Sequence, residues 1–179
     1  MNSICIFGDS IASGASDTEK GGWANRLRHH FDNQNGDDDI VVYNLGVRGD
    51  TTTSLLKRVN VECEARKPSI IIFAIGINDS QYTHPEDNAV TNIEKFGHNL
   101  EELTRIARKY TEKIIFTGLT RVDESKTKPT SWDQSVFYSN QSIELYKNTI
   151  QKFCSENSLS FIDISITSNS NFPGSNMIS

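Results

Sequence analysis

The chain has 179 residues, of which 36% are hydrophobic and 23% are charged. This length suits one α/β domain, which buries roughly 70% of its unfolded surface and folds without a disulfide or a metal. Its 18 basic and 23 acidic residues give a net charge of -5. That balance argues against a nucleic-acid-binding protein, because such proteins present a basic face to the phosphate backbone.

The sequence contains no segment typical of membrane insertion or export. No apolar run approaches the ~18 residues of a membrane-spanning helix, and the apolar stretch at residues 4–7 is too short for a signal peptide. Cys5, Cys63 and Cys154 lie far apart and form no C-x-x-C pair, which favours reduced, buried thiols. We therefore expect a cytoplasmic protein with no membrane partner, no disulfide and no metal site.

Short apolar runs alternate with longer segments in which apolar residues recur at helical spacing. In the first half, we expect strands over residues 3–7, 40–43 and 70–75, and helices over 22–31 and 51–66. The run at 70–75 is apolar on both alternating faces. This pattern is typical of a central parallel strand covered by helices on each side.

The second half repeats this order. We expect helices over residues 93–110 and 143–153, strands over 114–116 and 159–164, and a polar loop over 120–135. Strands that alternate with helices imply right-handed crossovers and a parallel sheet. The sequence therefore predicts one doubly wound α/β domain, in which a five-stranded parallel sheet lies between layers of helices.

The C-terminal residues depart from this pattern. Residues 165–179 are rich in Ser and Asn, contain a Pro-Gly pair and show no helical period. After a fifth strand, we would expect a closing helix on the open face of the sheet. We therefore divide the chain into a domain over residues 1–165 and an aperiodic tail over 166–179, with the closing helix missing. Apolar sheet surface left exposed in this way would favour self-association into a homo-oligomer.

Three polar clusters follow the first three strands, at residues 8–11, 44–51 and 76–80. In an open α/β sheet, ligands bind outside the carboxyl ends of the strands. Ser10 can present a nucleophilic hydroxyl there, the glycines of the second cluster let a backbone N–H approach an oxyanion, and Asn78 can aim its amide at the same oxygen. Each cluster alone also fits ordinary turn or helix-capping chemistry. Together they form the framework of an acyl-transfer site.

The sequences of these clusters, GDSI, NLGVRGDT and GIND, resemble the first three blocks of the SGNH (GDSL) hydrolase family. The resemblance covers about residues 1–165. It implies a flavodoxin-like three-layer α/β/α fold and the hydrolysis of small-molecule esters, thioesters or acetylated sugars, without a metal or cofactor. It also implies that Ser10 is the nucleophile, that Gly46 donates its backbone N–H to the oxyanion, and that Asn78 donates its side-chain amide.

The last block of the family, Asp-x-x-His ahead of a closing helix, has no counterpart here. Asp163 looks like the residue that ends the fifth strand, and residues 165–179 contain no histidine. His84 follows the Asn78 cluster in a loop near the sheet edge, where it is either a substitute base or an ordinary loop residue. Asp9 is expected to bond backbone and hold the turn that presents Ser10, rather than to act as a triad acid. The remaining histidines are expected on helix surfaces: His29, His30 and His98.

Three hypotheses for the function remain open. The first is a GDSL-type serine esterase or lipase that is impaired in this chain because the catalytic histidine is absent. The second is a binding protein of the same fold that keeps the pocket without turnover, a pseudoenzyme. The third is a shortened product of an active parent enzyme, which the aperiodic tail favours.

The loop over 120–135, which contains Trp132, has two interpretations. It either lies at the edge of the pocket and sets the substrate preference, or it is a solvated crossover loop.

Overall fold

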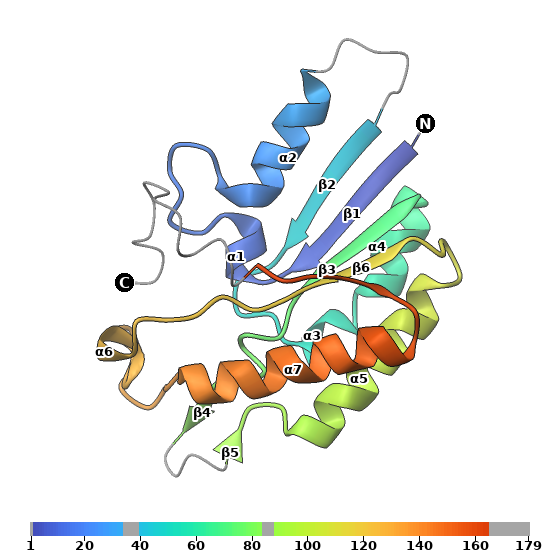
Figure 1. Ribbon diagram of the computed structural model, residues 1–179. Helices are drawn as coiled ribbons and strands as arrows, with labels where there is room; N and C mark the ends of the chain where they lie inside the picture. The colour runs from blue at the N-terminus through green and yellow to red at the C-terminus, as the bar shows by residue number, and fades with distance from the viewer. Residues whose placement is uncertain (1, 34–39, 84–87, 165–179) are drawn as a thin grey trace.

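The computed structural model of the chain describes residues 2–33, 40–83 and 88–164 (Figure 1). Its main sheet has five parallel strands, as the sequence predicts, and their order is β2-β1-β3-β6-β7. The strands are β1 (Asn2–Gly8), β2 (Ile40–Gly46), β3 (Ile70–Ala74), β6 (Ile114–Thr117) and β7 (Ser160–Ile162). A small antiparallel hairpin, β4 (Tyr82–Thr83) with β5 (Asn88–Ala89), follows β3 and was not expected.

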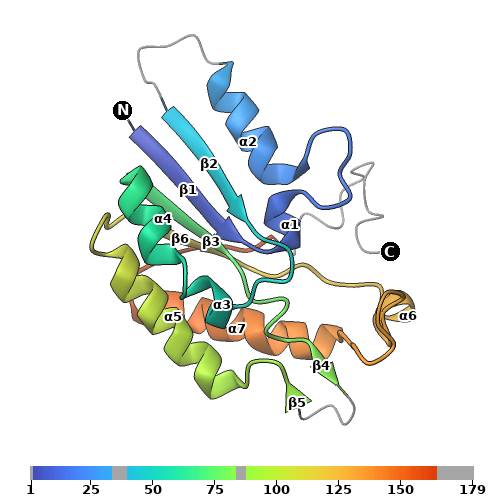
Figure 2. The same ribbon diagram turned by 180° about the vertical axis from the view of Figure 1, so that it is seen from behind.

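Helices cover both faces of this sheet, which gives the predicted three layers. They are α1 (Ser10–Ser13), α2 (Gly22–Asp32), α3 (Thr52–Leu55), α4 (Val59–Arg66), α5 (Ile93–Ala107), α6 (Glu124–Thr127) and α7 (Asn140–Glu156). The larger hydrophobic cluster packs α3, α4, α5 and α7 against one face of the sheet. The smaller cluster packs α1 and α2 against the other face, and Figure 2 shows α2 apart from the α4 and α5 layer.

The central strands are buried as their composition requires. Phe7 on β1, Phe73 on β3 and Phe116 on β6 have no exposed surface, and their rings form a continuous row across the sheet. The centroid of the Phe73 ring lies 5.8 Å from that of Phe7 and 4.9 Å from that of Phe116. Buried aromatic rings at these separations stabilise a core beyond the area that they bury.

The helix predicted over residues 51–66 is interrupted, because α3 ends after one turn. Thr51 and Ser54 form a reciprocal cap at the start of α3. Its last turn tightens, since the N–H of Arg58 bonds to the carbonyl of Leu55 at 3.0 Å instead of to the residue four positions back. The Arg58 side chain then turns towards Asp50, with Nη2 2.6 Å from the carboxylate. This contact brings the turn after β2 and the start of α4 together.

The three cysteines are buried and free, in agreement with the sequence analysis. Burial raises the pKa of the Cys5 and Cys63 thiols to about 12 and that of Cys154 to about 11. Such thiols stay protonated near neutral pH and therefore act as small core residues. Within the described ranges, no helix combines the length and the apolar character needed to cross a membrane.

The division between a domain over 1–165 and a tail over 166–179 stays a prediction, because residues 165–179 lie outside the described residues. The same holds for the missing closing helix. On the face of the sheet that α1 and α2 partly cover, the side chain of Ile162 at the end of β7 is 49% exposed. Asp163 directly follows β7, as expected for the residue that ends this strand.

Candidate active site

The three polar clusters meet at one edge of the sheet because their strands are parallel neighbours. Gly8 at the end of β1 is in register with Gly46 of β2 on one side and with Ala74 of β3 on the other. Each cluster therefore leaves the sheet at the same level, and α1 lies at the ends of β1 and β2 (Figures 1 and 2). A side chain at Gly8 would clash, since its Cβ would lie 2.5 Å from the carbonyl oxygen of Ala74.

Ser10 is the first residue of α1 and is half-buried. Asp9 caps the helix, and its Oδ1 accepts a hydrogen bond of 2.9 Å from the N–H of Ile11. The hydroxyl of Ser13 is occupied, because it donates to the carbonyl of Ser10 at 2.9 Å. Among the described residues, none forms a hydrogen bond with the Ser10 hydroxyl, so this group is available to a substrate and is not hydrogen-bonded to a base there.

Asp9 is only 2% exposed, and burial raises the pKa of its carboxyl group to about 7. The nearby charges of Asp79 and Asp50 raise it further, while the hydrogen bond from Ile11 opposes this shift. The contact with the Ile11 backbone agrees with the expectation that Asp9 holds the turn that presents Ser10.

Asn78 follows β3 and is 9% exposed, with both ends of its amide engaged. Its Nδ2 donates to the carbonyl oxygen of Asp50 at 2.9 Å, and its Oδ1 lies 2.9 Å from the hydroxyl of Tyr138. The carbonyl of Asp50 can only accept a hydrogen bond, so the orientation of the Asn78 amide is defined. Nδ2 retains a second N–H, which has no acceptor among the described residues.

Gly46 approaches α1 closely. A Cβ at this position would lie 2.4 Å from the N of Ser13, so a side chain is excluded. Its backbone N–H donates to Oδ1 of Asn44 at 3.1 Å. Gly46 remains the predicted oxyanion donor. To bind the oxyanion, its N–H must either break the hydrogen bond to Asn44 or donate to both acceptors at once.

The backbone N–H of Gly49 is a second candidate oxyanion donor, which the sequence analysis did not name individually. It is exposed and has a φ of 78° in the turn from Val47 to Asp50, which closes through a bond of 3.1 Å from the Asp50 N–H to the Val47 carbonyl. Positive φ at the third position of a turn favours glycine. The Gly49 N–H has no acceptor among the residues that the structure describes. The Gly-Asp pair after Arg48 is the sequence signal that could have found it.

Asp79 is fully buried behind the site and ties three segments together. Its carboxylate accepts the N–H of Thr52 at 3.0 Å and the Thr52 hydroxyl at 2.6 Å. The Thr52 hydroxyl in turn accepts a bond of 2.9 Å from Asn99 on α5. Burial raises the pKa of the Asp79 carboxyl group, whereas the Thr52 and Thr91 hydrogen bonds lower it. This network holds the residue that follows Asn78 against the start of α3 and against α5, and sequence reasoning did not identify it.

Among the described residues, no histidine forms a catalytic triad with Ser10. His29 and His30 are exposed on α2, as expected. His98 is exposed on α5, where its ring lies 3.4 Å from Glu101. His84, the candidate substitute base, lies outside the described residues. Within the described ranges, no group of three or more His, Cys, Asp or Glu side chains is arranged to hold a metal ion.

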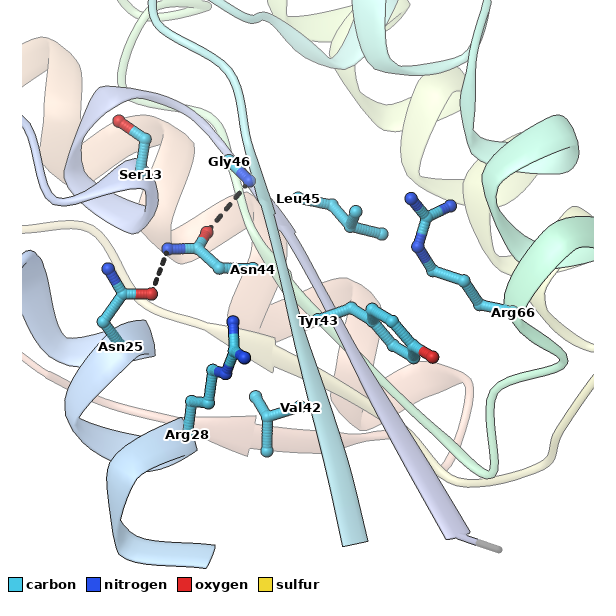
Figure 3. Close-up of a pocket in the computed structure, with 9 residues that line it drawn as sticks. All are labelled: Ser13, Asn25, Arg28, Val42, Tyr43, Asn44, Leu45, Gly46 and Arg66. Carbon is cyan, nitrogen blue, oxygen red and sulfur yellow. Dashed lines mark hydrogen bonds between the residues drawn. The ribbon is translucent and has the colours of Figure 1, made fainter. Parts of the chain in front are cut away.

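A polar cavity of about 340 Å³ lies beside the outer edge of β2 (Figure 3). The amide of Asn44 crosses this cavity, with Nδ2 3.4 Å from Asn25 and Oδ1 bonded to Gly46. Arg28 from α2 and Arg66 from α4 lie on either side of the strand. Ser10, Gly49 and Asn78 are not among the lining residues, but Gly46, the predicted oxyanion donor, is, so this cavity adjoins the proposed acyl site.

Comparison with known families gives the context of this edge of the sheet. The family model of the GDSL-like lipase/acylhydrolase family matches residues 6–177. The chain belongs to this family. A search of curated proteins finds no match.

Solved structures of similar fold include several esterases. A lipase/acylhydrolase from Enterococcus faecalis is 23% identical, with a TM-score of 0.72 over 97% of this chain and 81% of that chain. A catalytic mutant of an acetylxylan esterase from Geobacillus stearothermophilus is 16% identical, with a TM-score of 0.71 over 97% and 83%. The psychrotrophic esterase EstA from Pseudoalteromonas sp. is 15% identical, with a TM-score of 0.67 over 92% and 78%. At these identities the likeness demonstrates the fold alone.

Proposed function

We propose that this family member is a serine hydrolase that cleaves carboxylic esters, with Ser10 as its nucleophile. The observation that carries the proposal is the convergence of three groups at one sheet edge: a Ser10 hydroxyl and an Asn78 N–H that have no hydrogen-bond partner among the described residues, and an exposed Gly49 turn. Together they provide a nucleophile and donors for a developing negative charge, which are the requirements of acyl transfer.

In the proposed reaction, Ser10 Oγ attacks the acyl carbon while a base removes the hydroxyl proton. The tetrahedral oxyanion accepts hydrogen bonds from the Ser10 N–H, from the spare N–H of Asn78, and from Gly46 or Gly49. The intermediate collapses, and the alcohol leaves with the proton from the base. Water, deprotonated by the same base, then cleaves the acyl-enzyme and releases the carboxylic acid.

The base is the part of this mechanism for which the chain offers least. No histidine follows His98 in the sequence, and an unassisted serine hydroxyl is a weak nucleophile near neutral pH. We therefore propose that this 179-residue chain hydrolyses simple esters at least ~10³-fold more slowly than a family member with an Asp-x-x-His block, in line with the loss of a triad base. This same observation favours the second candidate function, a binding protein that retains the pocket without turnover.

Small acyl esters, acetylated sugars and thioesters are the proposed substrates. Catalytic mutants of the similar acetylxylan esterase carry alanine in place of a serine, an aspartate or a histidine, which supports serine chemistry on this fold. A panel of p-nitrophenyl esters of increasing acyl length, together with acetylated xylo-oligosaccharides, tests the substrate class.

The nucleophile is tested by labelling with a fluorophosphonate probe, followed by peptide mapping. We expect slow labelling at Ser10, which is abolished by Ser10→Ala. Ser13→Ala is the matched control, because Ser13 lies on the same helix and its hydroxyl is engaged with a backbone carbonyl. Labelling at another residue, with full esterase activity in Ser10→Ala, would refute the nucleophile assignment. Absence of any Ser10-dependent turnover, with retained binding of an ester analogue, would favour the binding protein.

A further inference from the structure

Tyr138 contacts Asn78 from a distant part of the chain. It precedes α7 and is 8% exposed, and its hydroxyl lies 2.9 Å from Oδ1 of Asn78 and 3.0 Å from Oε1 of Gln81. A phenol has one proton and can donate only one of these two bonds. The Tyr138 proton is therefore donated either to Asn78, the residue proposed to bind the oxyanion, or to Gln81.

The hydrogen bonds around Asn78 determine which residue accepts this proton. Since Nδ2 of Asn78 is fixed by the Asp50 carbonyl, the atom that faces Tyr138 is the amide oxygen, which can only accept. Gln81 is only half-buried, and its amide is free to present Nε2 instead of Oε1, since the two atoms are alike in shape. The arrangement that satisfies every group runs in one direction: Gln81 donates to Tyr138, Tyr138 donates to Asn78, and Asn78 donates to Asp50.

The backbone around Tyr138 is held independently of its hydroxyl. The Tyr138 N–H donates to the carbonyl of Thr127 at 2.9 Å, and the Thr127 hydroxyl donates to the Tyr138 carbonyl at 3.2 Å. The preceding residue, Phe137, exchanges two backbone bonds of 3.0 Å with Tyr82 of β4. Loss of the hydroxyl alone therefore leaves the ring in place, so the hydrogen bond can be tested without moving the segment.

We propose that Tyr138 is a positioning residue, which orients and polarises the Asn78 amide so that its spare N–H serves as the oxyanion donor. This inference rests on the proposed function. Hydrogen bonds in a chain strengthen one another in a low-dielectric interior, so donation to Oδ1 makes the N–H groups of the same amide better donors. Burial and the neighbouring Asp9 raise the pKa of the Tyr138 phenol to about 12, so the proton needed for this role is retained at working pH.

The test is a double-mutant cycle on Ser10-dependent hydrolysis of p-nitrophenyl acetate by the full chain. Tyr138→Phe should lower kcat by about 5- to 20-fold, the effect of one hydrogen bond, with KM unchanged within about twofold. In the Asn78→Ala background, the same substitution should change kcat by less than about twofold, because Tyr138 acts through Asn78. Gln81→Glu should lower kcat in the same way as Tyr138→Phe, because a carboxylate offers only acceptors and draws the phenol proton away from Asn78.

Tyr146→Phe is the matched control, because it also removes a buried phenol hydroxyl, one that donates to the carbonyl of Thr91. We expect it to reduce stability without changing kcat by more than about twofold. An equal loss of kcat from Tyr138→Phe with and without Asn78 would show a merely structural role and overturn the proposal. So would an unchanged kcat in Tyr138→Phe alone.

A second readout does not depend on turnover and separates this inference from the proposed function. The side-chain amide signals of Asn78 in a ¹⁵N-labelled sample are assigned by their absence in Asn78→Ala. Tyr138→Phe should shift these signals and speed their exchange with solvent. If they are unchanged, Tyr138 does not position Asn78, whether or not Ser10 reacts. If they shift while Ser10→Ala leaves the hydrolysis rate intact, the contact is real and the serine mechanism is wrong.

Discussion

Replacement of Asp9 by asparagine should stabilise the chain at neutral and alkaline pH. The carboxyl group is 2% exposed, and its pKa rises from 3.8 to about 7 on folding, chiefly through burial. Between these two values the folded chain holds a proton that the unfolded chain has released. Stability attributable to Asp9 is therefore greatest below pH 4 and declines as the pH rises through 7.

The size of this effect follows from the same two values. A change from 3.8 to about 7 corresponds to roughly 4 kcal/mol between the acid and alkaline limits, at about 1.4 kcal/mol for each pKa unit. Asp9→Asn keeps an oxygen that can accept from the Ile11 N–H but carries no charge. The difference in the free energy of unfolding between this variant and the parent chain should therefore grow by several kcal/mol from pH 4 to pH 8.

The assay is urea unfolding of both proteins at a series of pH values. Asp17→Asn is the control of opposite sign, because the Asp17 carboxylate is bonded to the Lys20 N–H and to Arg26, which lower its pKa to about 2. Its contribution should be present above pH 4 and lost as the pH falls towards 2. A difference between Asp9→Asn and the parent that stays constant from pH 4 to pH 8 would refute the claim that burial of this carboxylate costs stability.

Two further outcomes concern catalysis. Asn78→Ala should lower kcat by about 10²–10³-fold with little change in KM, because the Asn78 amide is proposed to bind the oxyanion rather than the ground-state carbonyl. A change in KM alone would make Asn78 a substrate-binding residue instead. The pH–rate profile of this chain should be unaffected by His84→Ala. An appended family-type segment with Asp-x-x-His and its helix should raise turnover by up to ~10³-fold. Near-normal turnover without that segment, lost in His84→Ala, would reveal a relocated base.

Much of the fold could be predicted because its strands are short, strongly apolar runs. The run at 70–75 corresponds to β3, whose three central residues are buried. Helix ends were less predictable: the apolar period begins at Ile143, whereas α7 begins at Asn140, where the Ser139 side chain caps it. The break between α3 and α4 coincides with the contact of Arg58 with Asp50, which periodicity does not reveal.

The candidate site was predictable where its chemistry is local. Ser10 lies two residues after the end of β1 and Asn78 four residues after the end of β3, so the order of the parallel strands brings both to one edge of the sheet. The Gly46 N–H proved to be bonded to a side chain only two residues away, a detail that spacing cannot show. Tyr138 is 60 positions from Asn78, and its preceding segment contains no motif that points to the sheet edge. Long-range contacts of single side chains of this kind become visible only in the folded chain.

The Asn44 side chain has a consequence for aggregation. Strand β2 is at the margin of the sheet, and an unpaired strand margin can recruit a strand from another chain. Asn44 binds the last N–H of β2 at Gly46, and the long side chains of Arg28 and Arg66 lie on either side of the same strand. A second copy that approached in register would have to displace the Asn44 amide and pass these two side chains, each of which is held in an ion pair on its own helix. This margin therefore resists the strand-to-strand stacking that leads to amyloid-like assemblies.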